Sequence, residues 1–207
     1  LPKTDMLAVA QAMLAAGSVK ELSVIGQGEC DKHFGTLILS ACSELWRRQK
    51  GTIALSALRL SSCALSDEDI HKTFPLRTAE QSKQQEGISE RLQLRQVDLS
   101  SNDLSDDGLS AFCGAIQQFS LQALIISDNR NLGDAGFDVL AKTVLAKQSL
   151  KTLELAGVGN FTVGGLASIA NHCWLQKLVL ADNTSLGSEA GPLYADLLSS
   201  PVLIYLD

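Results

Sequence analysis

A short leucine pattern returns at near-constant intervals along the chain, and this repetition restricts the possible folds more than any other feature. Its four clearest copies follow one another at intervals of 25 to 29 residues and begin at Leu94, Leu121, Leu150 and Leu175. Three further copies begin at Val19, Leu55 and Leu203. A fixed period of this length is typical of repeat architectures. We therefore predict seven copies of one structural unit in a single domain that spans residues 1–207.

The residues within a copy predict a strand followed by a helix. In LKTLELA, the apolar Leu153 and Leu155 alternate with Thr152 and Glu154, so one face of a short strand is buried and the other is in water. In GLSAFCGAIQQF, residues 108–119, apolar residues recur every three or four positions, which indicates an amphipathic helix. Because no single unit can bury both its strand face and its helix face, we expect the units to stack.

The copies that begin at Leu55 and Leu94 read LSALRLSSCAL and LRQVDLSSNDL. They follow L-x-x-L-x-L-x-x-[N/C]-x-L almost letter for letter, and in this the chain resembles the leucine-rich repeat family. The long copies resemble the ribonuclease-inhibitor-like subclass, in which a full helix follows each strand. The resemblance implies an α/β leucine-rich-repeat solenoid: a curved, right-handed β-α superhelix with a parallel sheet on the concave face and helices on the convex face.

The stretch 94–112 gathers acidic and amide side chains around a glycine, which raises the alternative of a calcium loop. Asp103, Ser105 and Asp107 occupy the first, third and fifth positions of an EF-hand pattern. The twelfth position is Gly114, which cannot supply the closing carboxylate. We therefore predict no metal site here.

The same residues have a structural interpretation. An asparagine recurs at one position of the repeat, at Asn102, Asn129 and Asn183, and the divergent copies carry Gln27, Cys63 and Val158 there. The resemblance implies that this side chain turns inward and bonds to loop backbone. Ser105 and Asp106 suit the start of a helix, where an oxygen accepts bonds from free N–H groups. Close packing of helix on sheet is the role we predict for the recurring glycines, Gly108, Gly136, Gly165 and Gly191.

One interval is longer than the others, and it separates the copies at Leu55 and Leu94. Pro75 should end the preceding helix, which begins at the capping box SDED, residues 66–69. We interpret residues 75–91 as a polar insertion within the second repeat, with a docking segment as the alternative, since insertions often carry function. The chain opens on an amphipathic helix and closes in mid-strand, so we expect a fragment of a longer protein.

Composition excludes several classes of protein. The net charge of −6 is spread along the chain, which argues against a nucleic-acid partner and favours a basic one. No run approaches the roughly 18 apolar residues of a membrane helix. The five cysteines are scattered among apolar neighbours, as reduced thiols are, so we expect a cytoplasmic location. The glycosylation sequons at Asn160 and Asn183 point the other way, although an inward Asn183 could not carry a glycan.

Familiar catalytic and ligand-binding patterns are incomplete. Cys30 and His33 have the spacing of half a zinc site, but no second pair at suitable spacing exists. The glycines of GNFTVGGL resemble a phosphate loop, but Gly165 and Leu166 stand where a lysine and a hydroxyl are required. Residues several units apart in a stack cannot meet, so no catalytic triad is expected. We predict no cofactor and no enzymatic activity.

The third, fifth and seventh positions of each copy should project from one face of the sheet, since alternation fixes the face of each side chain. Within this set, the binding residues that we predict are Arg59, Gln96, Asp98, Ile125, Thr152, Glu154, Lys177, Val179 and Tyr205. Ile125, beside Ala123 and near Val179, would form a small apolar patch with a polar rim, which is typical of a binding site.

Three functional hypotheses follow. The first is an interaction scaffold that holds a protein partner through the concave sheet and the adjoining loops. The second is a GTPase-activating domain, because leucine-rich-repeat activators of the Ran GTPase are similar in repeat length; the nearby arginines are Arg59, Arg95 and Arg130. The third is a regulatory repeat domain of a cytoskeletal or innate-sensing protein.

Overall fold

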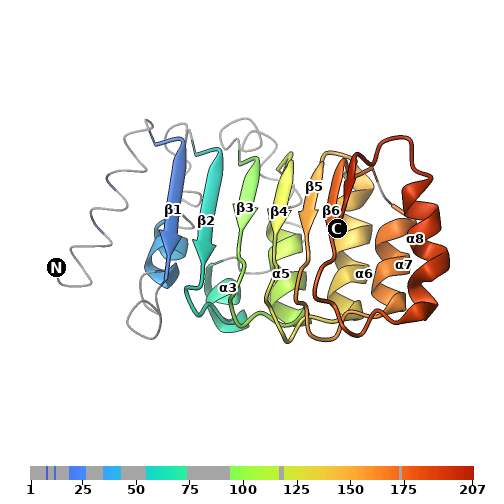
Figure 1. Ribbon diagram of the computed structural model, residues 1–207. Helices are drawn as coiled ribbons and strands as arrows, with labels where there is room; N and C mark the ends of the chain where they lie inside the picture. Colours follow the sequence, from blue (N-terminus) through green and yellow to red (C-terminus); the bar gives the residue numbers. More distant parts are fainter. Residues whose placement is uncertain are drawn as a thin grey trace, which may run out of the picture.

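A single parallel sheet of seven strands runs through the protein. The computed structural model describes residues 8, 12, 19–26, 35–42, 55–73, 94–116, 119–172 and 174–207. Its strands are hydrogen-bonded in the order of the sequence, from β1 at one edge to β7 at the other, so the sheet is open. Helices form a second layer on one face of this sheet (Figure 1). The architecture is the α/β alternation that the repeated pattern predicts.

The elements follow the predicted copies. The seven strands are β1 (Glu21–Ile25), β2 (Ala57–Ser61), β3 (Gln96–Asp98), β4 (Ala123–Ile125), β5 (Thr152–Glu154), β6 (Lys177–Val179) and β7 (Tyr205–Leu206). The helices are α3 (Asp67–Thr73), α5 (Asp106–Ile116), α6 (Asp134–Thr143), α7 (Val163–Ala170) and α8 (Gly191–Leu198), with the short 3₁₀ helices η2 (Leu145–Lys147) and η3 (Ser188–Ala190). Residues 35–42 are also helical. Each predicted copy begins at or just before a strand, which confirms the seven copies.

Four predictions fall on residues that the structure does not describe. They are the polar insertion at 75–91, most of the opening amphipathic helix, the inward position of Gln27, and the pair Cys30 and His33.

The strand register places equal positions of successive copies side by side. Val97, Leu124, Leu153 and Leu178 are neighbours across four strands, and all four are buried. The residues on either side of each are half-buried and face the other way. This confirms the predicted alternation. Burying each such leucine contributes about 1.5–3 kcal/mol, so these rows are a principal stabilising contribution.

The helices complete the interior with aliphatic and aromatic side chains. Helix α5 buries Leu109, Phe112 and Ile116, as its period predicts. Between α6 and the loop before α7, the rings of Phe137 and Phe161 meet edge to face, with centroids 4.7 Å apart. Among the described residues, no helix is both long and apolar enough to cross a membrane.

Three cysteines are buried in this interior as free thiols: Cys42, Cys63 and Cys113. Burial raises the pKa of Cys42 and of Cys113 to about 12, because a thiolate there would lose its hydration. These thiols therefore stay protonated at neutral pH and pack as small apolar side chains, as expected. Cys30 and Cys173 lie outside the described residues.

The recurring asparagine turns inward, as the resemblance implies. Asn129 is fully buried; its amide donates to the carbonyl of Leu99 in the preceding unit at 3.0 Å and to that of Ile126 in its own loop at 2.9 Å. Its side-chain oxygen accepts from the N–H of Leu104 at 3.2 Å. Asn102 makes equivalent bonds to the unit before it, as does Asn183. Each such asparagine therefore ties two successive units together.

A second set of bonds joins the starts of neighbouring helices. The carboxylate of Asp106, at the start of α5, accepts from the N–H of Gly133 in the next unit at 2.6 Å. Asp67 receives the amide and hydroxyl of Ser105 in the same way, and Asp134 receives those of Thr162. Ser105 itself caps α5, since its hydroxyl accepts from an amide of the first turn.

These aspartates explain the recurring glycines and correct our prediction for them. A Cβ on Gly108, Gly136 or Gly165 would lie 2.1, 2.7 or 2.6 Å from a carboxylate oxygen of the preceding unit's aspartate. The missing side chain thus permits the approach of one helix start to the next, and not of helix to sheet. Gly191 does not share this role, because nothing lies within 4 Å of its Cβ position.

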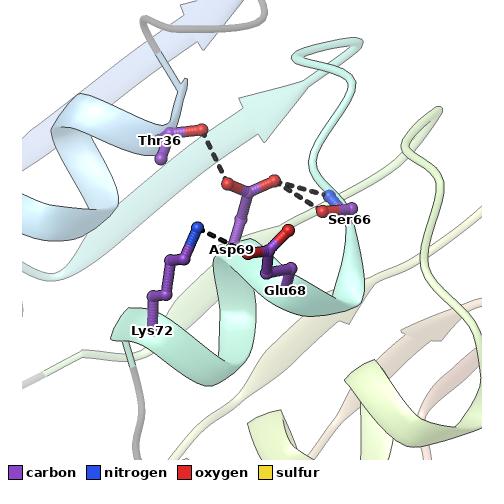
Figure 2. Close-up of polar contacts among 5 residues, drawn as sticks. All are labelled: Thr36, Ser66, Glu68, Asp69 and Lys72. Atoms are coloured by element: carbon purple, nitrogen blue, oxygen red, sulfur yellow. Dashed lines mark hydrogen bonds and ion pairs between the residues drawn. The ribbon is translucent and has the colours of Figure 1, made fainter.

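Half of the predicted capping box of α3 forms, the half in which the side chain of Asp69 reaches back to the N-cap Ser66, and Figure 2 shows it. The carboxylate of Asp69 accepts from the backbone N–H of Ser66 at 2.9 Å and from its hydroxyl at 2.8 Å. Its other oxygen accepts from the hydroxyl of Thr36 at 3.1 Å, so the box also joins α3 to the helical residues 35–42. Lys72 and Glu68 pair on the exposed side of the same helix.

Replacing Asn129 by alanine should lower the free energy of unfolding by about 2–4 kcal/mol, because buried groups of Leu99 and Leu104 lose their partner. Urea unfolding followed by circular dichroism measures this. Asn131→Ala is the matched control: Asn131 is exposed and bonds to Asp103, so its loss should cost less than about 0.5 kcal/mol. Equal losses in the two variants would show that the inward amide does not couple the units.

Gly136→Ala should destabilise the protein by about 1–3 kcal/mol, because the new methyl group would meet Asp106, whose carboxylate is held by Gly133. Gly191→Ala makes the same change in open space within a helix, and it should leave stability unchanged or raise it by up to about 1 kcal/mol. Thermal unfolding of both variants tests this. A tolerated Gly136→Ala would contradict the proposed helix-start contact.

Candidate functional site

One face of the sheet lies opposite the helices, and none of the described elements covers it (Figure 1). In most proteins a parallel sheet is covered on both faces. We call this surface the open face; it consists of the third- and fifth-position side chains that lie within the strands, Glu21, Ser23, Ala57, Arg59, Gln96, Asp98, Ala123, Ile125, Thr152, Glu154, Lys177, Val179 and Tyr205. A broad surface of this kind can receive another macromolecule.

The nine predicted binding residues lie together on the open face in two adjacent rows. The register aligns four of them in the third-position row, Gln96, Thr152, Lys177 and Tyr205. It aligns the other five in the fifth-position row, Arg59, Asp98, Ile125, Glu154 and Val179. Their role in binding stays a prediction.

At one end of the open face, Arg59 bridges three strands. Its guanidinium forms an ion pair with Glu21 on β1. It also donates to the side-chain oxygen of Gln96 on β3 at 3.3 Å. The charge of Arg59 is therefore already engaged by the protein itself.

At the other end, Lys177 is held by two neighbours. Its ammonium donates to Glu154 at 2.7 Å and lies 5.5 Å from the centre of the Tyr205 ring. The bond to Glu154 raises the pKa of Lys177, so this side chain is charged at neutral pH. Lys177 and Glu154 are both partly exposed, and such a pair contributes about 0–1 kcal/mol to stability.

Asp98 differs from the other charged side chains of the open face. One carboxylate oxygen accepts from the backbone N–H of Ser100 at 2.9 Å and from its hydroxyl at 2.6 Å. Within the part of the chain that the structure describes, Asp98 forms no ion pair. It lies on the third strand, between Arg59 and Ile125 in the register.

The predicted apolar patch is wrong as a continuous surface. The register places Glu154 between Ile125 and Val179, so a charged pair with Lys177 divides the two aliphatic side chains. Each of the two is only half exposed. The error arose because adjacency depends on every intervening copy, and the intervening copy is acidic.

Sequence reasoning missed two contributors to the site. Glu21 was in the predicted third-position row, but its pairing with Arg59 was not foreseen. The sequence pattern that could have predicted this pair is opposite charges at diagonal positions of neighbouring strands. Ser100 was in the predicted seventh-position row, but its bonds to Asp98 were not foreseen. An aspartate two residues before a serine often bonds to it, and Asp98 does so here.

The residues of the two alternative sites, the arginines of a GTPase-activating site and the ligands of a calcium loop, do not form a common cluster. Arg95 precedes β3 and Arg130 follows β4, so with Arg59 inside β2 the three arginines occupy three different levels of the sheet. Asp103, the first residue of the calcium pattern, accepts from Asn131 at 2.7 Å. Among the described residues, no group of three or more His, Cys, Asp or Glu side chains could hold a metal ion.

Comparison with known proteins agrees with the repeat interpretation. A family model described as Leucine Rich repeat matches residues 94–113, which run from the start of the third copy into α5. No curated protein matches the chain. The match covers one copy, and the structure repeats the same strand-and-helix unit on either side of it. Together these findings support a leucine-rich repeat fold and, in general terms, a role in protein interaction.

Proposed function

We propose that this chain is a protein-binding scaffold, a leucine-rich-repeat solenoid of the ribonuclease-inhibitor-like type that receives its partner on the open face. The observation that carries the proposal is a seven-stranded parallel sheet with one face left uncovered by the described helices. The proposal assigns the chain a binding role and no catalysis.

The geometry of the layers supports a concave open face. Packed helices lie about 8–10 Å apart, whereas paired strands lie about 4.8 Å apart. A stack that carries a helix beside each strand therefore bends toward its sheet. The helices α5, α6 and α7 follow consecutive strands, as this argument requires. The long copies also favour the ribonuclease-inhibitor-like subclass.

The two faces of each strand differ in how tightly the fold constrains them. On the buried face of β2 to β6, one aligned row is entirely aliphatic and nearly inaccessible: Leu58, Val97, Leu124, Leu153 and Leu178. On the open face, the fifth-position row changes from Arg59 to Asp98, Ile125, Glu154 and Val179. Such partly exposed side chains contribute little to stability, so the fold does not determine which residue stands at each position. Contacts with a partner would account for the variety of residues in this row.

Two features bear on a cytoplasmic location for this scaffold. The three described cysteines are free and buried, which suits a reducing compartment. Asn183 belongs to a glycosylation sequon but is only 7% exposed. Its side-chain oxygen accepts from the N–H of Val158, and its side-chain nitrogen donates to the carbonyl of Leu155. A glycan on Asn183 would be incompatible with this buried position, so that sequon does not argue for a secretory compartment, whereas Asn160 of the other sequon is exposed.

The combined substitution Asp98→Ala, Ile125→Ala and Glu154→Ala should change the free energy of unfolding by less than about 1 kcal/mol, because all three side chains are partly exposed. Chemical unfolding and circular dichroism provide the measurement. A large loss of stability would show that these three side chains are needed to stabilise the fold.

The same triple variant tests the function. Immobilised wild-type protein should retain at least one protein from a cell extract that the folded triple variant retains at least about tenfold less. The matched control is Asp138→Ala with Lys142→Ala, which removes an exposed ion pair from α6. The control should retain the same protein as the wild type. Equal retention by the triple variant would exclude the open face as the binding surface.

A further inference from the structure

On strands β1 to β6, Asp98 is the one charged side chain of the open face that forms no ion pair with a described residue. Glu21 and Arg59 neutralise each other at one end, and Glu154 and Lys177 do so at the other. The carboxylate of Asp98 has hydrogen bonds to Ser100 but no described cation. The middle of the face therefore carries one negative charge that the described fold leaves unpaired.

This carboxylate is held ready to accept a further bond. Ser100 donates twice to the same oxygen, at 2.9 Å from its amide and at 2.6 Å from its hydroxyl. These two bonds fix the orientation of the carboxylate and leave its second oxygen without a partner among the described residues. A partner that bonds to an oriented group loses less conformational entropy than one that must order it.

The neighbours of Asp98 select the kind of group that fits beside it. Ile125 is its register partner on β4 and offers half-exposed aliphatic surface. Arg59 is its partner on β2, but its guanidinium is directed to Glu21 and Gln96. A lysine or arginine combines a charged end with a long aliphatic stem, and such stems pack along apolar surface while the charge bonds to an acceptor.

We infer that the protein partner presents an arginine or lysine to the open face, with its charged end on Asp98 and its stem on Ile125. This inference rests on the proposed function and adds the chemistry of the partner. Charge complementarity supports it in two ways: the isolated charge of the face is negative, and the chain as a whole carries a net charge of −6. Asp98 is thus the anchoring residue of the open face.

A library of short random peptides displayed on phage provides the probe. Peptides are selected on the wild-type protein and counter-selected on the triple variant Asp98→Ala, Ile125→Ala, Glu154→Ala. The retained peptides should be enriched in arginine or lysine. Their dissociation constants should rise by about tenfold or more for Asp98→Asn, which removes the charge but can still accept the bonds from Ser100. Asp138→Asn on α6 removes the same charge elsewhere and should leave the constants unchanged.

The outcomes separate this inference from the proposed function. Peptides that require the open face but lack basic residues, or that bind Asp98→Asn as tightly as wild type, overturn the inference while the binding face remains. Peptides that bind the triple variant as tightly as wild type contradict both the inference about Asp98 and the proposed binding role of the open face. Replacing the enriched basic residue of a peptide by norleucine should abolish the difference between wild type and Asp98→Asn, and a persisting difference counts against a direct contact.

Discussion

The structure depends on hydrogen bonds that each unit supplies to the interior of its neighbour. From β2 to β6 the chain turns toward the following helix through a short loop, and a buried backbone group left unsatisfied there costs about 1–3 kcal/mol. The three inward asparagines satisfy two loops at once, their own and the preceding one. Cys63 takes this position in an earlier copy, where its thiol lies 3.7 Å from the carbonyl of Val24. The same contact forms whether the preceding loop lies 28 residues earlier, as for Asn183, or 42 residues earlier, as for Asn102.

This coupling separates the residues that the fold needs from those that it leaves free. Leucines and inward amides occupy the space between sheet and helices, and a change in either leaves a cavity or an unpaired polar group. The open face lies on the other side of the same strands. Its side chains can vary from copy to copy without disturbing that interior, which is why a stack of similar units can carry a specific surface.

The sequence predicts best those features of the structure that depend only on residues of a single copy. The alternation in LKTLELA fixes which side of β5 is buried, and the capping box at Ser66 and Asp69 fixes the start of α3. Contacts between copies were harder to predict. The role assigned to Gly136 was wrong because the group that approaches it, Asp106, belongs to the preceding unit. The apolar patch failed for the same reason, since Glu154 comes from the copy between its two members.

The contacts between helix starts also explain why the unit that contains α8 differs from the units before it. Three consecutive carboxylates reach from the start of one helix to the start of the next. At the equivalent position α7 begins with Val163, which has no oxygen to offer. The next helix start, at Gly187, has no side-chain cap; a 3₁₀ turn precedes α8, and α8 buries only Leu197. The unit that contains α8 is therefore held to its neighbour by the sheet, by packing and by the bonds of Asn183, without the helix-start bond that joins the units before it.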